Sequence, residues 1–181
     1  MIKKILLTLA LLGLGTQLSA YETEVEKESS YYVVVKGIYI LGDDVKHEDV
    51  ILKGDGNYGF GIDLGYRLEH GFALEYDFSY ATNDVKEDIN TFNASYMTHA
   101  LDLVYSYEII HNTKLFAKAG YEYEKEKISD LNIDNSSDGA VLGAGVEYEL
   151  DHTYNLVVEY EHSTIDGPRG DSINLGVMYN F

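Results

Sequence analysis

Apolar and polar residues alternate with a period of two at the C-terminal end of the chain. Ile173, Leu175, Val177, Tyr179 and Phe181 would lie on one face of an extended strand, and mainly small or polar residues on the other. The chain ends on an aromatic residue of this apolar face, whereas the termini of soluble domains are usually polar and poorly ordered. The pattern therefore predicts a terminal strand with one apolar face.

Seven further segments of the chain alternate in the same way. They cover approximately residues 31–40, 58–67, 72–80, 101–108, 115–124, 140–150 and 154–161. Alternation with this period is typical of strands whose two faces have different surroundings. In the first segment, where Val33, Val34 and Val35 follow one another, we expect Lys36 to face the interior. The outward residues of that segment would be Val33, Val35, Gly37 and Tyr39.

The connections between these segments alternate between short and long. The short ones are residues 67–71, 109–113 and 151–153, and the long ones are residues 41–57, 81–97, 125–138 and 163–171. An up-and-down meander of eight strands places all short turns at one end and all long loops at the other. We therefore predict an all-β fold, an eight-stranded antiparallel up-and-down transmembrane β-barrel over residues 31–181, with strands of about nine to eleven residues.

The distribution of polarity favours a membrane as the surroundings of this barrel. Leu, Val, Phe and Tyr occupy one face of nearly every segment, whereas carboxylates occupy the other. A water-soluble barrel that holds a small ligand would have to expose the first face and bury the second. In hydrocarbon, by contrast, a closed barrel pairs every backbone N–H and C=O group internally. Two interfacial girdles of tyrosines would form at the strand ends, one from Tyr66, Tyr107, Tyr148, Tyr154 and Tyr179 and one from Tyr39, Tyr58, Tyr80, Tyr123 and Tyr160.

The C-terminal residues also resemble a targeting signal. The terminal strand of bacterial outer-membrane barrels carries a polar residue, a glycine and two aromatic residues at fixed spacing. These positions are occupied by Asn174, Gly176, Tyr179 and Phe181. Together with the eight alternating segments, they make the chain similar to the small outer-membrane β-barrel family, the group of OmpX-like proteins and the OmpA transmembrane domain. The resemblance implies a location in the cell outer membrane, contact with outer-membrane lipid and lipopolysaccharide, and recognition of the C-terminal strand by the barrel-assembly machinery.

The first twenty residues are predicted to be a signal peptide that is cleaved after Ala20. Lys3 and Lys4 precede an apolar run, residues 5–14, that is too short to cross a bilayer as a helix. Residues 21–30 are polar and acidic, and we interpret them as a periplasmic lead-in. Cleavage would make the formal net charge of −18 more negative by two, so nucleic acid is not expected as a partner. The sequence has no Cys, which excludes disulfides and thiolate metal sites.

Charged residues on the inward face form the main candidate site. The expected lumen network consists of Lys36, Asp63, Glu75, Asp77, Asp102, Lys118, Glu122, Glu147 and Glu159. Glycines on the same face make room for these side chains in the narrow interior of an eight-stranded barrel. Buried carboxylates need partners, for which Lys36 and Lys118 are the natural choices, but acids outnumber bases. Two interpretations follow: the network fills the barrel and prevents conduction, or a wet, negative lumen forms a narrow cation-preferring pore.

The long loops are acidic as well. The residues concerned are Asp43, Asp44, His47, Glu48 and Asp49 in the first loop and Asp130, Asp134 and Asp138 in the third. Carboxylates of this kind bind calcium or bridge to lipopolysaccharide through divalent ions. Residues 134–139 begin like an EF-hand loop, but Gly145 occupies the twelfth position, where a bidentate Glu is needed. We therefore assign no metal site and no cofactor, and we expect the loops to offer a surface to an extracellular protein ligand.

The residues near His162 decide whether catalysis is expected. Barrels that deacylate lipid A resemble one another in a His-any-Ser arrangement on one face, whereas here His162 and Ser163 are adjacent, beside Glu161. Adjacent strand residues point to opposite faces, so these two cannot form a base and nucleophile pair without a bulge. We predict no catalytic residues and a structural or surface-interaction role in adhesion or envelope integrity. A cation-preferring pore is the first alternative, and a lipid A-modifying enzyme is the second.

Overall fold

The computed structural model describes residues 30–47, 50–87, 89–128 and 133–181. The expected signal peptide, residues 1–20, lies outside these residues, as does the lead-in over residues 21–30 except for Ser30. Three of the acidic loop residues, Glu48, Asp49 and Asp130, lie outside them as well. Nearly all of the predicted barrel, residues 31–181, is therefore described.

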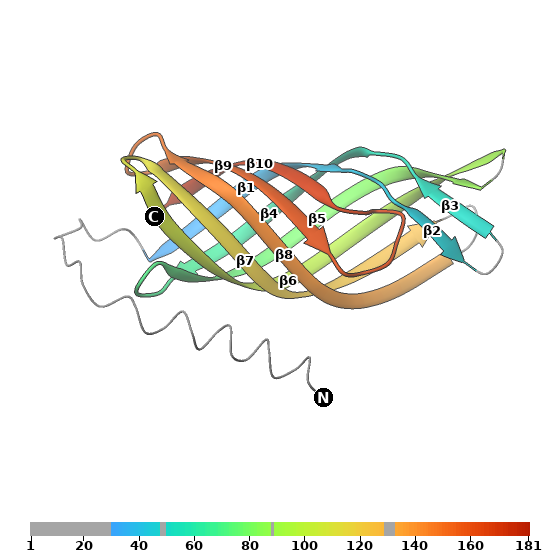
Figure 1. Cartoon of the computed structure of the whole chain (residues 1–181), viewed down its shortest axis with the longest axis horizontal. Helices are drawn as coiled ribbons and strands as arrows, with labels where there is room; N and C mark the ends of the chain where they lie inside the picture. The colour runs from blue at the N-terminus through green and yellow to red at the C-terminus, as the bar shows by residue number, and fades with distance from the viewer. Residues whose placement is uncertain (1–29, 48–49, 88, 129–132) are drawn as a thin grey trace, which may run out of the picture.

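All regular structure in this part of the chain is β-strand. The strands are β1 (Tyr31–Ile40), β2 (Asp44–His47), β3 (Val50–Gly54), β4 (Asn57–Arg67), β5 (Phe72–Glu87), β6 (Asn90–Ile110), β7 (Thr113–Ile128), β8 (Ile133–Glu149), β9 (Tyr154–Ser163) and β10 (Ser172–Asn180). Antiparallel pairing joins β1, β4, β5, β6, β7, β8, β9 and β10 into a ring, since β1 pairs with both β4 and β10. The predicted eight-stranded up-and-down barrel is confirmed (Figure 1).

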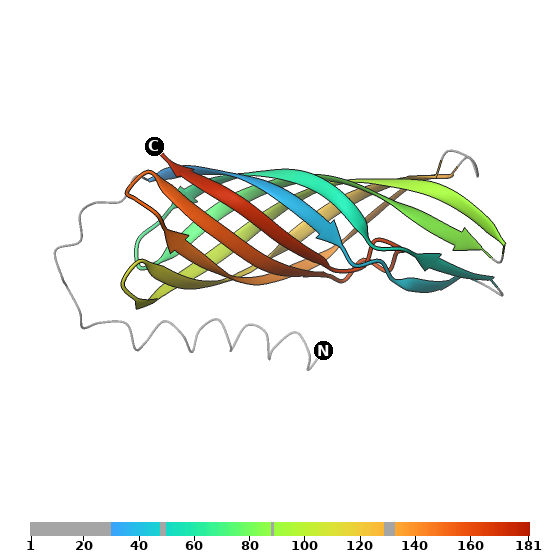
Figure 2. The same ribbon diagram turned by 90° about the horizontal axis from the view of Figure 1, so that it is seen from above.

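The first and last strands of the ring close the barrel. Pairing of β1 with β10 runs from Tyr32 opposite Asn180 to Ile40 opposite Ser172. The backbone N–H of Phe181 then donates to the Tyr31 carbonyl oxygen at 3.2 Å, so the last residue is part of the closure. The C-terminus and the three short turns lie at one end of the barrel, which we call the short-turn end, and the β2–β3 hairpin lies at the opposite, long-hairpin end (Figures 1 and 2).

The strands face as the alternation predicts. On β1, Val35 is 60% exposed and Lys36 is 4% exposed, which confirms the expected facing of the least regular segment. The ten girdle tyrosines are all exposed. Several stack with a neighbour across a strand pair: the ring centroids of Tyr154 and Tyr179 are 5.4 Å apart at the short-turn end. An apolar outer surface bounded by tyrosines matches the surface that a lipid bilayer requires.

The long connections differ from the prediction. Two segments expected as loops, residues 81–97 and 125–138, are largely strand, because β5 runs to Glu87 before β6 begins and β7 runs to Ile128 before β8 begins. A third, residues 41–57, contains the β2–β3 hairpin, which joins the ring through β3 and β5. Strands β5 to β8 therefore have 16 to 21 residues, more than the nine to eleven expected.

Polarity changes sides along these long strands, which explains why their outer parts were missed. In the membrane half of β5, Leu74 is exposed and Glu75 is buried. In the outer half the odd-numbered residues still face inward, but here the inward residue Val85 is apolar and buried and the outward residue Lys86 is charged and exposed. The outer halves of the strands thus have apolar interiors and polar exteriors, as a water-soluble β-sheet does. Extension of the pairing beyond the membrane follows, because the sheet continues to bury apolar side chains there.

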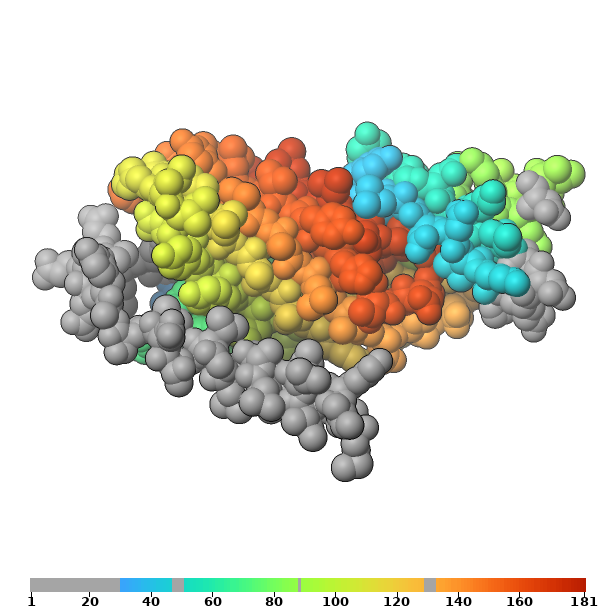
Figure 3. All heavy atoms as spheres, viewed as in Figure 1, coloured from blue at the N-terminus to red at the C-terminus, as the bar shows by residue number. Residues whose placement is uncertain are grey.

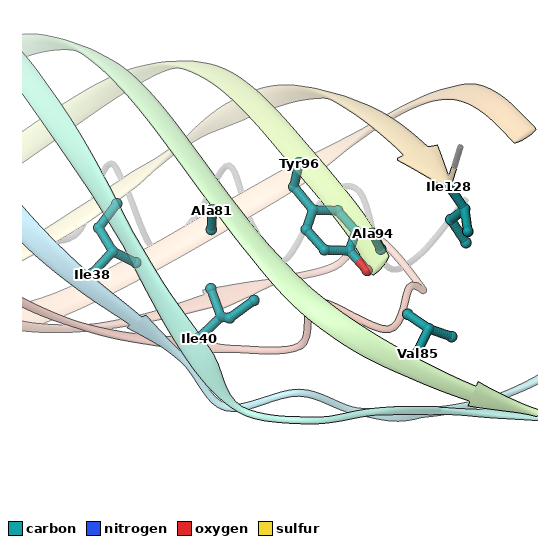
Figure 4. Packing of buried hydrophobic residues seen from close by; sticks show 7 residues of the cluster. All are labelled: Ile38, Ile40, Ala81, Val85, Ala94, Tyr96 and Ile128. Carbon is teal, nitrogen blue, oxygen red and sulfur yellow. The ribbon is translucent and has the colours of Figure 1, made fainter. Parts of the chain in front are cut away.

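An apolar cluster fills the interior of the long-hairpin end. Its buried members are Ile38, Ile40, Ala81, Val85, Ala94, Tyr96 and Ile128, contributed by β1, β5, β6 and β7 (Figure 4). Leu52 of the β2–β3 hairpin, Phe92 and Ile133 pack against them. The Tyr96 hydroxyl donates a hydrogen bond to Asn83 Oδ1 at 3.0 Å, which satisfies the polar atom of the largest member. This cluster holds the outer hairpins together above the membrane.

Candidate site: the charged lumen

A belt of buried ionisable side chains crosses the middle of the barrel. Lys36 of β1 lies 2.8 Å from Asp63 of β4 and also pairs with Asp77 of β5. Strand pairing explains the meeting, since Lys36 lies opposite Gly61 and Asp63 lies opposite Asp77. A Cβ on Gly61 would approach the Lys36 side chain to 2.8 Å, so the glycine makes room for the lysine.

Lys118 of β7 is the second centre of the belt. Its ammonium group lies 2.8 Å from Glu159, 3.0 Å from Glu161, 3.4 Å from Asp77 and 3.9 Å from Glu75. The neighbouring strand β8 carries Gly143 opposite Lys118, where a Cβ would lie 2.4 Å from a Glu159 oxygen. The glycine therefore allows Lys118 to reach across β8 to β9.

Negative charge exceeds positive charge in this belt. Its carboxylates are Asp63, Glu75, Asp77, Asp102, Glu159 and Glu161, and its bases are Lys36 and Lys118. Asp102 is 1% exposed, and within the described part of the chain neither of its oxygens has a hydrogen-bond partner. Buried carboxylates that share a limited number of ammonium groups favour cations and disfavour anions in the lumen.

Arg169 forms a second charged layer, nearer the long-hairpin end. Its Nη2 lies 3.0 Å from Glu122 and its Nε lies 2.5 Å from Glu124, both on β7. The Ser163 hydroxyl also donates to Glu122. Arg169 is 5% exposed although it belongs to the β9–β10 connection, residues 164–171. This connection therefore folds into the mouth of the barrel and closes it from above.

Backbone hydrogen bonds hold the β9–β10 connection in the mouth. The N–H groups of Gly42 and Asp43 donate to the carbonyl oxygens of Arg169 at 3.0 Å and Pro168 at 3.2 Å. Asn83 Nδ2 donates to the same Pro168 oxygen at 2.9 Å. The space-filling view shows the chain after β1 packed beside this connection (Figure 3). Gly42 has a φ of 71°, and a Cβ there would lie 2.2 Å from the Gly54 oxygen, so only glycine fits this close approach.

A third polar layer lies toward the short-turn end. The Tyr32 hydroxyl donates to Glu75 at 2.9 Å, and the Arg67 guanidinium lies over the Tyr32 ring at 4.6 Å from its centroid. Glu147 accepts a hydrogen bond from Asn155 at 2.5 Å and lies 3.9 Å from Lys114. Charged and aromatic groups therefore continue through the lumen to this end.

The structure brings most of the predicted lumen residues together but distributes them over these three layers. The belt contains Lys36, Asp63, Glu75, Asp77, Asp102, Lys118 and Glu159, whereas Glu122 belongs to the Arg169 layer and Glu147 to the short-turn layer. Sequence reasoning missed Arg169 because a loop residue has no period that predicts its direction. It also missed Tyr32, which a run of β-branched neighbours concealed. Arg67, at the border between the 58–67 strand and the 67–71 turn, was not included in the predicted network.

The residues considered for catalysis point apart. Nδ1 of His162, which is exposed, lies 2.7 Å from Asp171, whereas Ser163 bonds to Glu122 inside the barrel. The Asp171 carboxyl is partly buried, which opposes ionisation, but the Tyr160 and His162 hydrogen bonds outweigh this and lower its pKa. The expected arrangement on opposite faces is thus what the geometry gives. A nucleophile and base pair is not assembled at these two residues.

Three acidic residues at the long-hairpin end each have a hydrogen-bond or ion-pair partner. Asp134 lies 3.2 Å from Lys125, and Asp138 accepts a hydrogen bond from Tyr121. Asp43 accepts a hydrogen bond from the backbone N–H of Asp44 at 2.7 Å. Among the described residues no group of three or more His, Cys, Asp or Glu side chains has the geometry to hold a metal ion. Asp134 and Asp138 lie on β8 and not in a loop, which corrects the predicted loop position.

The C-terminal residues occupy both faces of β10. Asn174 is 2% exposed and its side-chain amide donates to Glu159 at 3.4 Å, and Gly176 is buried. Tyr179 and Phe181 face outward with their ring centroids 5.0 Å apart. Two of the four positions thus contribute to the lumen, and the two aromatic ones form part of the surface at the short-turn end.

A closed barrel with an apolar, tyrosine-bounded exterior and a charged interior defines a transmembrane β-barrel of the outer-membrane class. Within the described residues, no helix has the length and hydropathy to cross a bilayer. The family model described as outer membrane protein beta-barrel domain matches residues 6–181, so the chain belongs to this family. The family resemblance inferred from the sequence and the expected location in the cell outer membrane are confirmed.

Solved structures with the same fold come from several Gram-negative bacteria. The outer membrane protein OprG from Pseudomonas aeruginosa is 13% identical, with a TM-score of 0.65 over 85% of this chain and 97% of its own. Neisserial surface protein A is 18% identical, with a TM-score of 0.59 over 86% and 100%. Ail of Yersinia pestis, in complex with the heparin analogue sucrose octasulfate, is 18% identical, with a TM-score of 0.56 over 87% and 100%. Comparison with curated protein sequences gives no match.

Proposed function

We propose that this protein is a non-conducting outer-membrane barrel with a structural or adhesive role at the cell surface. The observation that carries the proposal is the obstruction of the lumen at successive levels. The Lys36–Lys118 belt, the Arg169 layer and the apolar cluster around Tyr96 each combine side chains from different strands. An eight-stranded barrel has little interior space beyond what side chains fill, so these layers leave no continuous aqueous path.

The two ends have different roles in this proposal. The short-turn end faces the periplasm and the long hairpins face outward, as in other bacterial barrels of this architecture. The exposed apolar belt contacts outer-membrane lipid and lipopolysaccharide. The barrel-assembly machinery recognises the C-terminal strand, including Tyr179 and Phe181.

The long hairpins provide the surface for an extracellular protein ligand. Exposed carboxylates are distributed over them, at Asp43, Asp44, Asp84, Asp134, Asp138 and Asp166. We expect a basic protein surface as the partner, in contrast to the polyanionic heparin analogue bound by Ail. Nucleic acid is not expected, for the same reason. We propose no enzyme activity, and the separation of His162 from Ser163 supports this.

The test is single-channel conductance of the refolded mature barrel in planar bilayers at low and high salt. We expect no discrete steps from the wild type, shown to be folded by its heat-modifiable migration on gels. Conductance is also measured for two variants. Arg169→Ala removes the ion pairs that hold the β9–β10 connection in the mouth of the barrel, and Lys86→Ala, an exposed change on the β5–β6 hairpin, is its matched control. Discrete cation-selective steps from the wild type would overturn the proposal in favour of a narrow cation-preferring pore, which the excess of carboxylates in the belt favours as the second candidate.

A further inference from the structure

A cavity of about 350 Å³ lies inside the barrel at the short-turn end. Leu68, Gly71 and Glu108 contribute to its wall and are exposed, so the cavity opens to solvent at this end. Its volume is in the range of sites that bind small molecules. None of the described residues of the outer hairpins contributes to it.

Part of the cavity wall is apolar. Val34, Val104, Phe116, Val157 and Met178 line it, and all five belong to or pack against a buried apolar cluster. They come from β1, β6, β7, β9 and β10, so the wall is fixed by the barrel and does not depend on a loop. Such a wall favours an apolar group of a ligand.

The deep end of the cavity is acidic. Asp63, Glu75 and Glu159 line it and are 3%, 7% and 4% exposed, whereas neither Lys36 nor Lys118 contributes to the lining. The two lysines lie behind these carboxylates, and each is shared between several of the belt's acids. Lys36 pairs with two carboxylates and Lys118 with four. The carboxylates therefore present to the cavity a negative charge that the belt neutralises only in part.

Basic residues line the cavity nearer its opening. Arg67 and Lys114 lie 4.0 Å and 3.9 Å from the same Glu147 oxygen, and Glu108 is a further acid of this rim. Acids and bases are thus equal in number at the rim, whereas acids predominate at the deep end. The field inside the cavity draws a cation inward and opposes an anion.

We propose that this cavity binds a small organic cation from the periplasmic side, an amine with an apolar body. Its ammonium group lies against Glu75, whose second partner is the Tyr32 hydroxyl at 2.9 Å, with Asp63 and Glu159 beside it. Its apolar body lies against Phe116, Val104 and Val157. The site shares no residue with the outer surface described above, so either proposal stands or falls without the other.

The test is a titration of the refolded mature barrel in detergent micelles, followed by methyl NMR. The probes are 2-phenylethylammonium, the neutral 2-phenylethanol and the anionic phenylacetate. We expect the ammonium probe to shift the methyl signals of Val104, Val157 and Met178 saturably. The methyls of Val35 and Val177, which face the detergent, report partitioning of the probe into the micelle.

Two variants separate charge from space. Glu75→Gln keeps an acceptor for Tyr32 but removes the charge, and we expect it to weaken binding of the ammonium probe about tenfold. Val104→Phe fills the cavity and leaves the charges, and we expect it to abolish the saturable shifts. Val177→Phe, on the outer face, should change neither result. Equal affinity for the alcohol and the ammonium probe, shifts confined to Val35 and Val177, or unchanged binding in both lumen variants would overturn the proposal.

Discussion

Nε of Arg169 lies 2.5 Å from the carboxylate of Glu124, which joins the β9–β10 connection to the inner face of β7. The Arg169 Nη2 atom lies 3.0 Å from Glu122, and all three residues are at most 5% exposed. Arg169→Ala would leave two carboxylates buried without their counter-ion. We expect the free energy of unfolding in guanidinium chloride to fall by about 3–5 kcal/mol.

The loss should depend on the two carboxylates and not on the loop. Asp166→Ala, an exposed change in the same connection, should leave the midpoint of unfolding in guanidinium chloride unchanged. Adding Glu122→Gln and Glu124→Gln to Arg169→Ala should restore much of the lost stability. If the triple variant is as unstable as the single one, the ion pairs are not what holds the connection in place.

A glycine pair tests the close packing of the lumen. A Cβ on Gly65 would lie 1.9 Å from the Tyr32 ring, whereas a Cβ on Gly37, on the lipid face, would come no closer than 3.9 Å to Leu175. We expect Gly65→Ala to lower the free energy of unfolding by about 1–3 kcal/mol through overpacking. Gly37→Ala should be neutral.

A second change can show that the ring causes the effect. Combining Gly65→Ala with Tyr32→Leu should cost less than the sum of the two single changes, because the shorter side chain vacates the contact. Strict additivity in urea unfolding would argue against the contact.

Stability of the outer hairpins should depend on pH through Glu126. Burial above the membrane raises the pKa of this carboxyl from its ordinary value of 4.5. The folded state then binds the proton more tightly than the unfolded state, so the contribution of Glu126 to stability decreases as the pH rises above that value. We expect Glu126→Gln to become more stable relative to the wild type between pH 4 and pH 7.

The comparison requires thermal melts of both proteins by circular dichroism across this range. Asn135→Ala changes the residue paired with Glu126 on β8 without removing a titrating group, so its difference from the wild type should stay constant with pH. A constant difference for Glu126→Gln would contradict the expected pH dependence.

The C-terminal aromatic residue should matter more in the cell than in the test tube. We expect Phe181→Ser to reduce the amount of folded barrel in the outer membrane severalfold if, as proposed above, the assembly machinery recognises this strand. Refolding of the purified variant into detergent should remain near normal, since Phe181 is 68% exposed and at the edge of the barrel. Ile110→Ser, which is also at the short-turn end and 65% exposed, controls for the loss of an apolar surface group. Equal effects of both changes in cells would contradict a role of Phe181 in recognition by the assembly machinery.

The membrane half of the fold was predictable because a single rule governs it. Each strand there separates lipid from lumen, so the period of two determines the facing of residues such as Val35 and Lys36. The same rule placed most of the belt, since every inward charge has to meet another inside so narrow a ring.

The outer half was not predictable by that rule. On β5 the polar residues Asp84 and Lys86 face outward, and a segment whose outward residues are polar does not continue the membrane pattern. The long strands therefore look like polar loops in the sequence, although pairing continues to Glu87. The inward position of Arg169 could not be predicted for another reason. The direction of its side chain depends on a backbone contact with Gly42, which is far away in the sequence.

The exchange of apolar and polar faces along β5 to β8 fixes the depth of the barrel in the bilayer. If the barrel moved outward, Phe78 and Tyr80 would leave the hydrocarbon at its outer boundary, and if it moved inward, Asp84 and Lys86 would enter it. Either displacement has a free-energy cost that grows with each ångström, so the height of the apolar belt is matched to one hydrocarbon thickness of the membrane. A bilayer whose hydrocarbon region is thicker or thinner than this belt must itself deform around the protein.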